Sequence, residues 1–160
     1  MNKDISFQEL IPNNHCFGCG STNSLGLQIH SYWLNENESR CSFTPMLHHC
    51  AGPTHILNGG IISTVIDCHC VCTAIAKGYQ LQGREIGQGE AIWFATGKLE
   101  VSYLKPVPID SPIELIAKIE SATANKIMLT CSVYSDSDLC CKGTVVAVKV
   151  PNSWLNGSAK

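Results

Sequence analysis

The sequence predicts an α+β fold in which one long central helix is wrapped by an antiparallel sheet of about five to six strands. Residues 59 to about 76 form an apolar stretch without proline or a turn cluster, and this stretch is longer than a normal strand. Two segments with strand character precede it and four follow it. A single helix among many strands is typical of a helix layer packed on one sheet.

The part of the chain before the helix is predicted to hold an N-terminal extension and two strands. Residues 1–24 are expected to form loop and short helix around the sequence NHCFGCGSTNS. The strands are predicted at LGLQIHSYWL and SRCSFTP, separated by the turn-like NENE. A polar loop that contains His48 and His49 then leads to the helix.

The part after the helix is predicted to be a glycine-rich loop and four strands. The loop covers residues 78–89 and contains Arg84, and it could border a substrate channel or be a plain connector. The strands are predicted at AIWFATGKLEVSYLKPV, PIELIAKIESA, NKIMLTCSVYS and LCCKGTVVAVKV. We therefore expect one main domain over residues 25–150, with residues 151–160 as a tail.

Composition and charge exclude several classes of protein. The chain is 44% hydrophobic and 15% charged, which favours a well-buried globular or oligomeric protein over a disordered one. A net charge of -2 gives no electrostatic basis for binding nucleic acid or an anionic membrane. The first residues lack the pattern of a signal peptide, and Asp67 and His69 interrupt the most apolar stretch. We expect a soluble, cytoplasmic protein without a membrane span.

The ten cysteines are expected to be reduced, and those in apolar segments to pack as small hydrophobic residues. Cys16 and Cys19 form a C-x-x-C beside His15, which is half of a zinc knuckle. Candidates for a second ligand pair are His48, His49 and Cys50, or Cys140 and Cys141. Because there is no second C-x-x-C, turn-forming structural cysteines are expected here, and no metal. The cysteines of CHCVC (residues 68–72) are expected to pack in the core.

Asp67 lies on a strip of small and polar residues along the predicted helix. At about 100° per residue, the strip consists of Gly60, Ser63, Thr64, Asp67, Cys70 and Ala74. A solvated face would carry Lys, Glu or Gln, so we expect a partner helix or a ligand against this strip. A solvated Asp67 is the alternative. His69 projects about 200° away from Asp67 and is expected in the core or an interface.

The glycine pair at the start of the helix predicts a site for a carbonyl group. The first N–H groups of a helix have no intrahelical partner, and the N–H of Gly59 is suited to stabilising an oxyanion. Gly59 and Asp67 are separated by roughly 12 Å along the helix axis. One carbonyl carbon cannot contact both. If they share a site, Asp67 comes from a second copy of the chain, and chemistry requires a dimer.

These residues resemble the PaaI-like hotdog-fold thioesterases. The likeness is carried by NGGIISTVID at the helix start and by TGKLEVSYLKPV in the following strand. The segment CFGCGSTNSLGLQI resembles the CxxCG…N-x-x-GL opening of many members. The resemblance covers the chain from about Cys16 to Lys149 and implies the hotdog fold.

The resemblance also implies roles for single residues. Gly59 takes the place of the oxyanion-hole glycine, and Asp67 that of the general base or nucleophile contributed by the opposite subunit. Thr96 matches the residue that assists this carboxylate or its water. The family has a histidine where this chain has Asn58, whose amide can donate a hydrogen bond to a thioester carbonyl but cannot titrate. His55 could partly substitute for that histidine.

The sequence thus predicts a hydrolase of acyl thioesters, with an acyl-CoA as the expected substrate. Gly60, Ser63 and His55 are expected to contact the substrate. The family's polar residue about six positions before the glycine pair falls near Gly52, so His48 or His49 could approach instead. The protein is expected to be a homodimer or a tetramer of dimers, with neither a metal nor an organic cofactor. The alternative, favoured by Asn58, is a hotdog protein that binds an acyl or aromatic ligand without turnover.

Overall fold

The structure, a computed structural model, describes residues 5–157 as one sheet with a long helix lying across it. The elements in chain order are α1 (Phe7–Leu10), β1 (Ser31–Trp33), β2 (Glu38–Phe43), the 3-10 helix η1 (Leu47–His49), α2 (Gly59–Leu81), β3 (Phe94–Tyr103), β4 (Ile113–Ala122), β5 (Lys126–Ser135), β6 (Asp138–Lys149) and the 3-10 helix η2 (Asn152–Trp154). The six strands lie in the order β1-β2-β4-β5-β6-β3, and each neighbouring pair is antiparallel. The predicted α+β hotdog architecture is confirmed.

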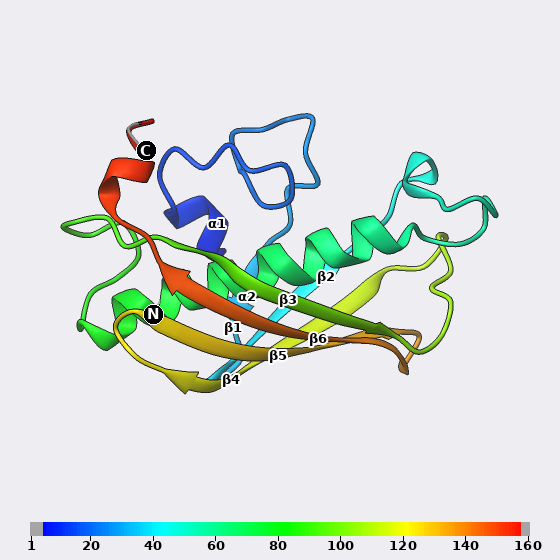
Figure 1. Ribbon diagram of the computed structural model, residues 1–160. Helices are drawn as coiled ribbons and strands as arrows, with labels where there is room; N and C mark the ends of the chain where they lie inside the picture. The colour runs from blue at the N-terminus through cyan, green and yellow to red at the C-terminus, as the bar shows by residue number, and fades with distance from the viewer. Residues whose placement is uncertain (1–4, 158–160) are drawn as a thin grey trace.

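The core lies between α2 and the face of the sheet that curves around it (Figure 1). Every second residue of β4 faces the helix, so Ile113, Leu115 and Ala117 are fully buried while their neighbours are more exposed. This period of two is the pattern of a sheet with one buried face. On the helix, Ile66 and Ile75 are buried against it. Burial of aliphatic side chains of this size stabilises the fold by about 1.5–3 kcal/mol each.

The helix α2 is longer than predicted, because Gly78 lies inside it and not in a loop. Gly78 is buried, and a Cβ atom at this position would lie 2.8 Å from Cε2 of Phe94 and 3.0 Å from Cγ2 of Ile92. A glycine therefore allows the last turns of the helix to approach the start of β3 closely. The prediction that a loop begins at Gly78 is wrong for this reason, and the helix continues to Leu81.

The connection between α2 and β3 is held together by Arg84. Its guanidinium group donates hydrogen bonds to the backbone carbonyls of Gln88 and Glu90 and lies 5.0 Å from the ring centroid of Tyr79. These contacts are internal to the segment and its adjoining helix. The segment connects the two elements and also borders a groove, which it lines with Gly83, Arg84, Glu85 and Ile86.

The first strand is shorter than predicted, because the residues before it pair with the C-x-x-C loop. The N–H of Leu27 donates to the carbonyl of Phe17 at 2.7 Å, and the N–H of Ile29 donates to Gly18 at 3.2 Å. These bonds use backbone groups that would otherwise extend β1. As a result the N-terminal segment lies against α2 on the side away from the sheet (Figure 1).

The domain boundaries at residues 24/25 and 150/151 stay predictions. Residues 1–4 of the predicted extension and residues 158–160 of the predicted tail lie outside the described residues. The rest of the extension contributes buried side chains to the core, including Phe7 and Ile11.

By length and composition alone, α2 could cross a membrane, although Asp67 and His69 were expected to exclude such a stretch. Its 18-residue apolar window is 61% buried inside the fold. The apolar character of α2 is thus that of a core helix, whose surroundings are the sheet on one side and the N-terminal segment on the other.

The strand β3 lies at one edge of the sheet. It pairs with β6 on one side, and its other side has no strand partner among residues 5–157. Six of its ten residues are exposed and include Thr96, Lys98 and Glu100. A long edge strand with free backbone groups is a ready template for pairing with another chain.

Candidate active site

Asn58 begins the helix α2 as its N-cap. Its Oδ1 accepts hydrogen bonds from the N–H groups of Gly60 at 2.7 Å and Ile61 at 3.3 Å. Its own N–H donates to the carbonyl of His49 at 2.9 Å. Asparagine is among the best N-cap residues, so Asn58 has a capping role besides the role toward a substrate that the sequence predicts. The cap uses Oδ1, the acceptor of the amide. The Nδ2 group is its donor and can bind a carbonyl oxygen of a ligand.

The N–H of Gly59 is the first donor of α2 and is left open by this cap. Asn58 satisfies the N–H groups of Gly60 and Ile61, and the N–H of Ile62 donates to the carbonyl of Asn58 at 3.1 Å. Within residues 5–157 the N–H of Gly59 has no hydrogen-bond partner. This group carries the partial positive charge of the helix start. It is the donor expected to bind a carbonyl oxygen.

Tyr103, at the end of β3, fixes the start of the helix. Its hydroxyl donates to the carbonyl of Gly59 at 2.8 Å and shares a hydrogen bond of 2.6 Å with Oγ of Ser63. The ring lies against Gly59, where a Cβ atom would be 3.4 Å from Cε1. Tyr103 could not be predicted as a site residue, because the strand pattern does not indicate which exposed residue contacts a helix 40 positions earlier in the chain.

Asp67 and Thr96 meet between α2 and β3. Oγ1 of Thr96 donates a hydrogen bond of 2.5 Å to Oδ1 of Asp67. The carboxylate is half-buried. Burial raises the pKa of Asp67, the hydrogen bond from Thr96 lowers it, and the charge of Cys19 raises it again, with a net increase. The family resemblance predicts that these two residues act together, and they are in contact within one chain.

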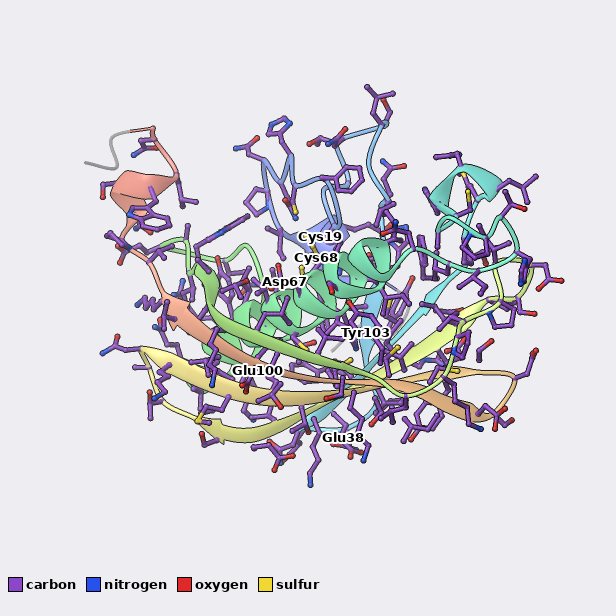
Figure 2. The ribbon with its side chains drawn as sticks, turned by 45° about the vertical axis from the view of Figure 1, so that its right-hand side comes forward. Cys19, Glu38, Asp67, Cys68, Glu100 and Tyr103 are labelled. Carbon is purple, nitrogen blue, oxygen red and sulfur yellow. The ribbon has the colours of Figure 1, made fainter. Side chains whose placement is uncertain are left out.

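Asp67 and Gly59 do not meet within one chain. Both belong to the same continuous helix, eight residues apart, which corresponds to about 12 Å along its axis. Figure 2 shows Asp67 in the middle of α2, beside Cys68 and Cys19, and Tyr103 further along toward the helix start. The two predicted reactive groups are therefore two separate places on the surface of a single chain.

The small polar strip of α2 is open only in its first half. Gly60 is exposed, and the strip stays accessible as far as Asp67. Cys70 and Ala74 are fully buried and belong to the same core cluster as Cys131 of β5. The expectation of a partner or ligand along the whole strip is therefore wrong for its second half, which faces the sheet.

The histidines near the helix start differ in their surroundings. His49 is buried, its Nδ1 accepts a hydrogen bond from the N–H of Met46 at 3.0 Å, and burial together with the nearby His48 lowers its pKa. His49 is thus occupied in supporting its loop. His48 and His55 are exposed, and His55 donates no side-chain hydrogen bond in the described part of the chain.

His69 belongs to the core, as predicted. Its Nδ1 and Nε2 lie 2.8 Å and 3.4 Å from the hydroxyls of Ser31 and Ser39. It is fully buried, and burial lowers its pKa to about 4, so the ring is neutral. A neutral histidine bound to two hydroxyls is a satisfied polar group of the core, and it does not contact Asp67.

The C-x-x-C loop lies directly on α2. Cys19 and Cys68 are buried, Cys16 is at the surface, and their sulfur atoms all lie within 4.8 Å of one another. Hydrogen bonds from Cys16, Cys68 and Cys72 lower the pKa of the Cys19 thiol. Cys68 is not among the second ligand pairs that the sequence suggests, which lie at positions 48–50 or at positions 140 and 141.

A groove of about 400 Å³ lies away from these residues, between α1 and the last turns of α2. Its walls include Phe7, Trp33, Ala76 and Gln80. Neither Gly59 nor Asp67 contributes to it. This groove and the predicted reactive groups therefore do not coincide.

No protein-family model and no curated protein sequence matches this chain. Solved structures do. A thioesterase superfamily protein from Shewanella loihica is 29% identical, with a TM-score of 0.64, and the match covers 87% of this chain and 96% of that one. A thioesterase from Haemophilus influenzae is 13% identical, with a TM-score of 0.65 and coverage of 82% and 85%.

The PaaI protein of the phenylacetic acid degradation operon of E. coli is also similar. It is 10% identical, with a TM-score of 0.64, and the match covers 78% of this chain and 81% of that one. At identities of 10% and 13%, these likenesses show the fold alone. The Shewanella protein, at 29% identity, confirms the resemblance to thioesterases that the sequence motifs predict.

Proposed function

We propose that this chain, which belongs to the PaaI-like hotdog-fold thioesterases, hydrolyses an acyl thioester, and that the substrate is an acyl-CoA. The observation that supports this most is the free N–H of Gly59 at the capped start of α2. A fixed backbone donor with partial positive charge is suited to the oxygen of a thioester carbonyl, which gains negative charge when the carbonyl carbon is attacked.

The second component is the carboxylate of Asp67, oriented by Thr96. A half-buried carboxylate with a raised pKa is a better base than a solvated one. It takes a proton from the attacking water, or it attacks the carbonyl carbon itself, and water then hydrolyses the resulting anhydride. Either route consumes one water and releases one carboxylic acid and one thiol.

The two components come from two copies of the chain in this proposal. The separation of about 12 Å along α2 excludes a site built by one helix. The free edge of β3 supports a homodimer, because pairing of two such edges about a two-fold axis satisfies the backbone groups of both strands. Thr96 lies on this strand, so the interface would adjoin Asp67. Two dimers could associate further into a tetramer.

The remaining predicted residues have defined roles in the proposed site. The Nδ2 group of Asn58 donates to the thioester carbonyl beside the N–H of Gly59. Gly60 leaves space for the substrate at the exposed helix start, and Ser63, held by Tyr103, and His55 border it. The proposed hydrolysis requires no metal and no organic cofactor. A cytoplasmic location is part of the proposal.

One observation favours a second function, the binding of an acyl or aromatic ligand without turnover. The residue that replaces the family's histidine, Asn58, is occupied as a helix cap and cannot titrate. A hotdog protein with a fixed amide at this position could hold a carbonyl group without activating it.

A thiol-release assay over short, medium and aromatic acyl-CoAs separates the two functions. We expect release from at least one of them, and a decrease of about 10²- to 10⁴-fold in the Asp67→Asn variant. Glu36→Gln is a matched control, because this carboxylate is exposed and its backbone carbonyl is bound by Lys77, near the end of α2 that is opposite to Gly59. Saturable binding of acyl-CoA without thiol release from any of them would support the second function and contradict the first.

A further inference from the structure

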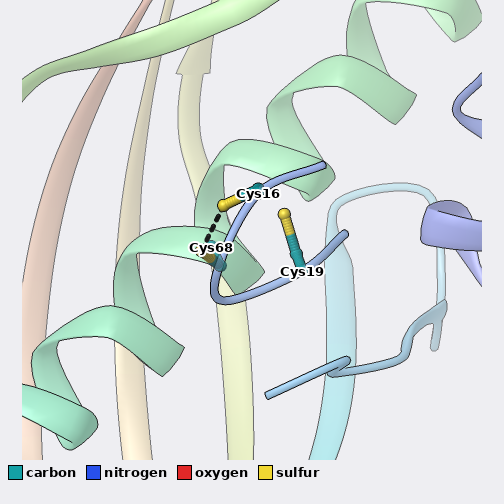
Figure 3. Close-up of side chains that lie close together, drawn as sticks. All are labelled: Cys16, Cys19 and Cys68. Atoms are coloured by element: carbon teal, nitrogen blue, oxygen red, sulfur yellow. Dashed lines mark hydrogen bonds between the residues drawn. The ribbon is translucent and has the colours of Figure 1, made fainter. Parts of the chain in front are cut away.

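Three cysteine sulfur atoms converge beside α2, and the proposed hydrolysis does not use them. Cys16 and Cys19 come from the N-terminal loop, and Cys68 comes from the third turn of α2 (Figure 3). The three atoms lie within 4.8 Å of one another. Among residues 5–157, this is the only group of three or more His, Cys, Asp or Glu side chains that are gathered closely enough to hold one metal ion.

The spacing of these atoms fits a tetrahedral metal site better than a disulfide. The sulfur atoms of Cys16 and Cys68 are 3.6 Å apart. Zinc–sulfur bonds of about 2.3 Å place two ligands of a tetrahedron roughly 3.8 Å from each other. A disulfide would need a sulfur–sulfur distance of about 2.05 Å.

The loop is shaped to bring the sulfur atoms together. A Cβ atom on Gly18 would lie 2.3 Å from Sγ of Cys68, and one on Gly20 would lie 2.6 Å from the backbone of Cys16. Only a loop without side chains at these two positions approaches the helix this closely. The glycines therefore account for the sequence CFGCG, in which Cys19 lies between two glycines.

A buried asparagine holds both cysteines of the loop. Asn14 is 2% exposed, and its Oδ1 accepts a hydrogen bond from the N–H of Cys16 at 3.1 Å. Its Nδ2 donates to the carbonyl of Cys19 at 3.3 Å and to Sγ of Cys19 at 3.4 Å. Side chains that orient the ligands from behind are a regular part of protein metal sites.

We propose that Cys16, Cys19 and Cys68 bind a zinc ion, with Cys72 as the fourth ligand. Cys72 follows Cys68 by one helical turn, so the two side chains share a face of α2. The sulfur atom of Cys72 is not among the three that lie within 4.8 Å of one another, so the fourth ligand bond requires the Cys72 side chain to turn toward the ion. Four sulfur ligands in tetrahedral arrangement are typical of structural zinc sites, and thiolate ligands select soft metals. Zinc binding displaces the thiol protons into solvent.

This proposal replaces the expectation of metal-free turn cysteines. The C-x-x-C of the N-terminal loop supplies one pair of ligands, and the C-x-x-x-C of α2, at positions 68 and 72, supplies the other. The ion would join the N-terminal segment to the core helix immediately after Asp67. Its role is to hold the segment in place, and it is independent of the proposed hydrolysis.

The metal content of the purified protein tests the proposal. The protein is produced with zinc in the medium and a tag free of histidine, then measured by elemental analysis. We expect about one zinc per chain. Cys16→Ser, at the surface, and Cys72→Ser should each lose most of it. Cys50→Ser is the matched control and should keep it, because Cys50 lies outside the cluster.

Cobalt provides a second measurement that does not depend on activity. Cobalt-substituted protein should show the absorption of tetrahedral cobalt with several thiolate ligands, and this absorption should weaken in Cys16→Ser and persist in Cys50→Ser. Less than about a tenth of a zinc per chain in protein with reduced thiols would overturn the proposal. Full zinc content in Cys16→Ser and Cys72→Ser would overturn it as well. So would an intact mass two hydrogens lighter, with Cys16 and Cys68 joined by a disulfide.

Discussion

Thr96, on the edge strand of the sheet, donates a hydrogen bond of 2.5 Å to Asp67 in the middle of the core helix. This contact joins two elements that lie 29 positions apart in the chain and fixes the orientation of a half-buried carboxylate next to an unpaired strand edge. The carboxylate therefore lies where a second copy of the chain can reach it.

The first prediction concerns this hydrogen bond. In Thr96→Val the shape of the side chain is kept and the hydroxyl is lost, so kcat/KM should fall by roughly 10- to 150-fold, equivalent to the about 1.5–3 kcal/mol of a hydrogen bond to a charged group. Thr96→Ser keeps the donor and should retain most of the activity. Since Thr96 is exposed, the melting temperature should stay nearly unchanged in both. Equal activity of the valine and serine variants would show that the hydroxyl has no role.

The two roles of Asn58 can be separated by two substitutions. Asn58→Asp keeps the oxygen that caps α2 but loses the Nδ2 donor, so stability should be preserved while thiol release falls. Asn58→Ala loses both, and the free energy of unfolding should also decrease by about 0.5–2 kcal/mol. Denaturant unfolding and the thiol-release assay measure the two effects. An aspartate variant with wild-type activity would contradict the assignment of Nδ2 as a carbonyl donor.

Tyr103 is predicted to position the helix start. Tyr103→Phe keeps the ring and removes the hydroxyl that binds the carbonyl of Gly59 and the hydroxyl of Ser63. Loss of these bonds costs about 0.5–1.5 kcal/mol each at most, so thiol release should decrease several-fold without unfolding. Tyr134→Phe is the control, since its hydroxyl has no hydrogen bond within the described residues. A similar decrease in both variants would point to a general effect of the missing hydroxyl.

Gly18 is predicted to be essential for the packing of the N-terminal loop on α2. In Gly18→Ala the new methyl group would overlap Sγ of Cys68, at 2.3 Å, and approach Cγ2 of Thr64, at 2.9 Å. We expect a loss of about 1–3 kcal/mol in the free energy of unfolding, measured with denaturant. Gly52→Ala meets no atom within 4 Å and should be nearly neutral. If the two variants are equally stable, the loop does not lie against the helix as described.

The elements of the fold could be predicted from the sequence because their patterns are local. The long apolar stretch indicated α2, and alternation with turn clusters indicated the strands. The errors occurred where a distant part of the chain decides. Gly78 continues the helix because Phe94 packs against it, and residues 25–30 leave the sheet because they bind the C-x-x-C loop.

The candidate site was predictable to the extent that it follows from helix geometry and from the family resemblance. Helix geometry and the resemblance together predicted the site residues Gly59, Asp67 and Thr96. The capping role of Asn58 could have been inferred, since asparagine before a helix is a strong N-cap signal. Tyr103 and the contact of Cys68 with Cys16, 52 positions apart, depend on how the loops and the edge strand lie over α2, and no local pattern encodes this.

The central claim is that one site needs Gly59 of one chain and Asp67 of another. It is tested most directly by mixing two inactive variants, Asp67→Asn and Gly59→Val, in which a branched side chain blocks the oxyanion position. In a mixed dimer one site carries both changes and the other carries neither. After the variants are unfolded and refolded together at equal concentration, thiol release should return to about a quarter of the wild-type rate, because half of the dimers are mixed and each has one intact site. If native mass spectrometry shows mixed dimers and the mixture stays inactive, the shared site is contradicted.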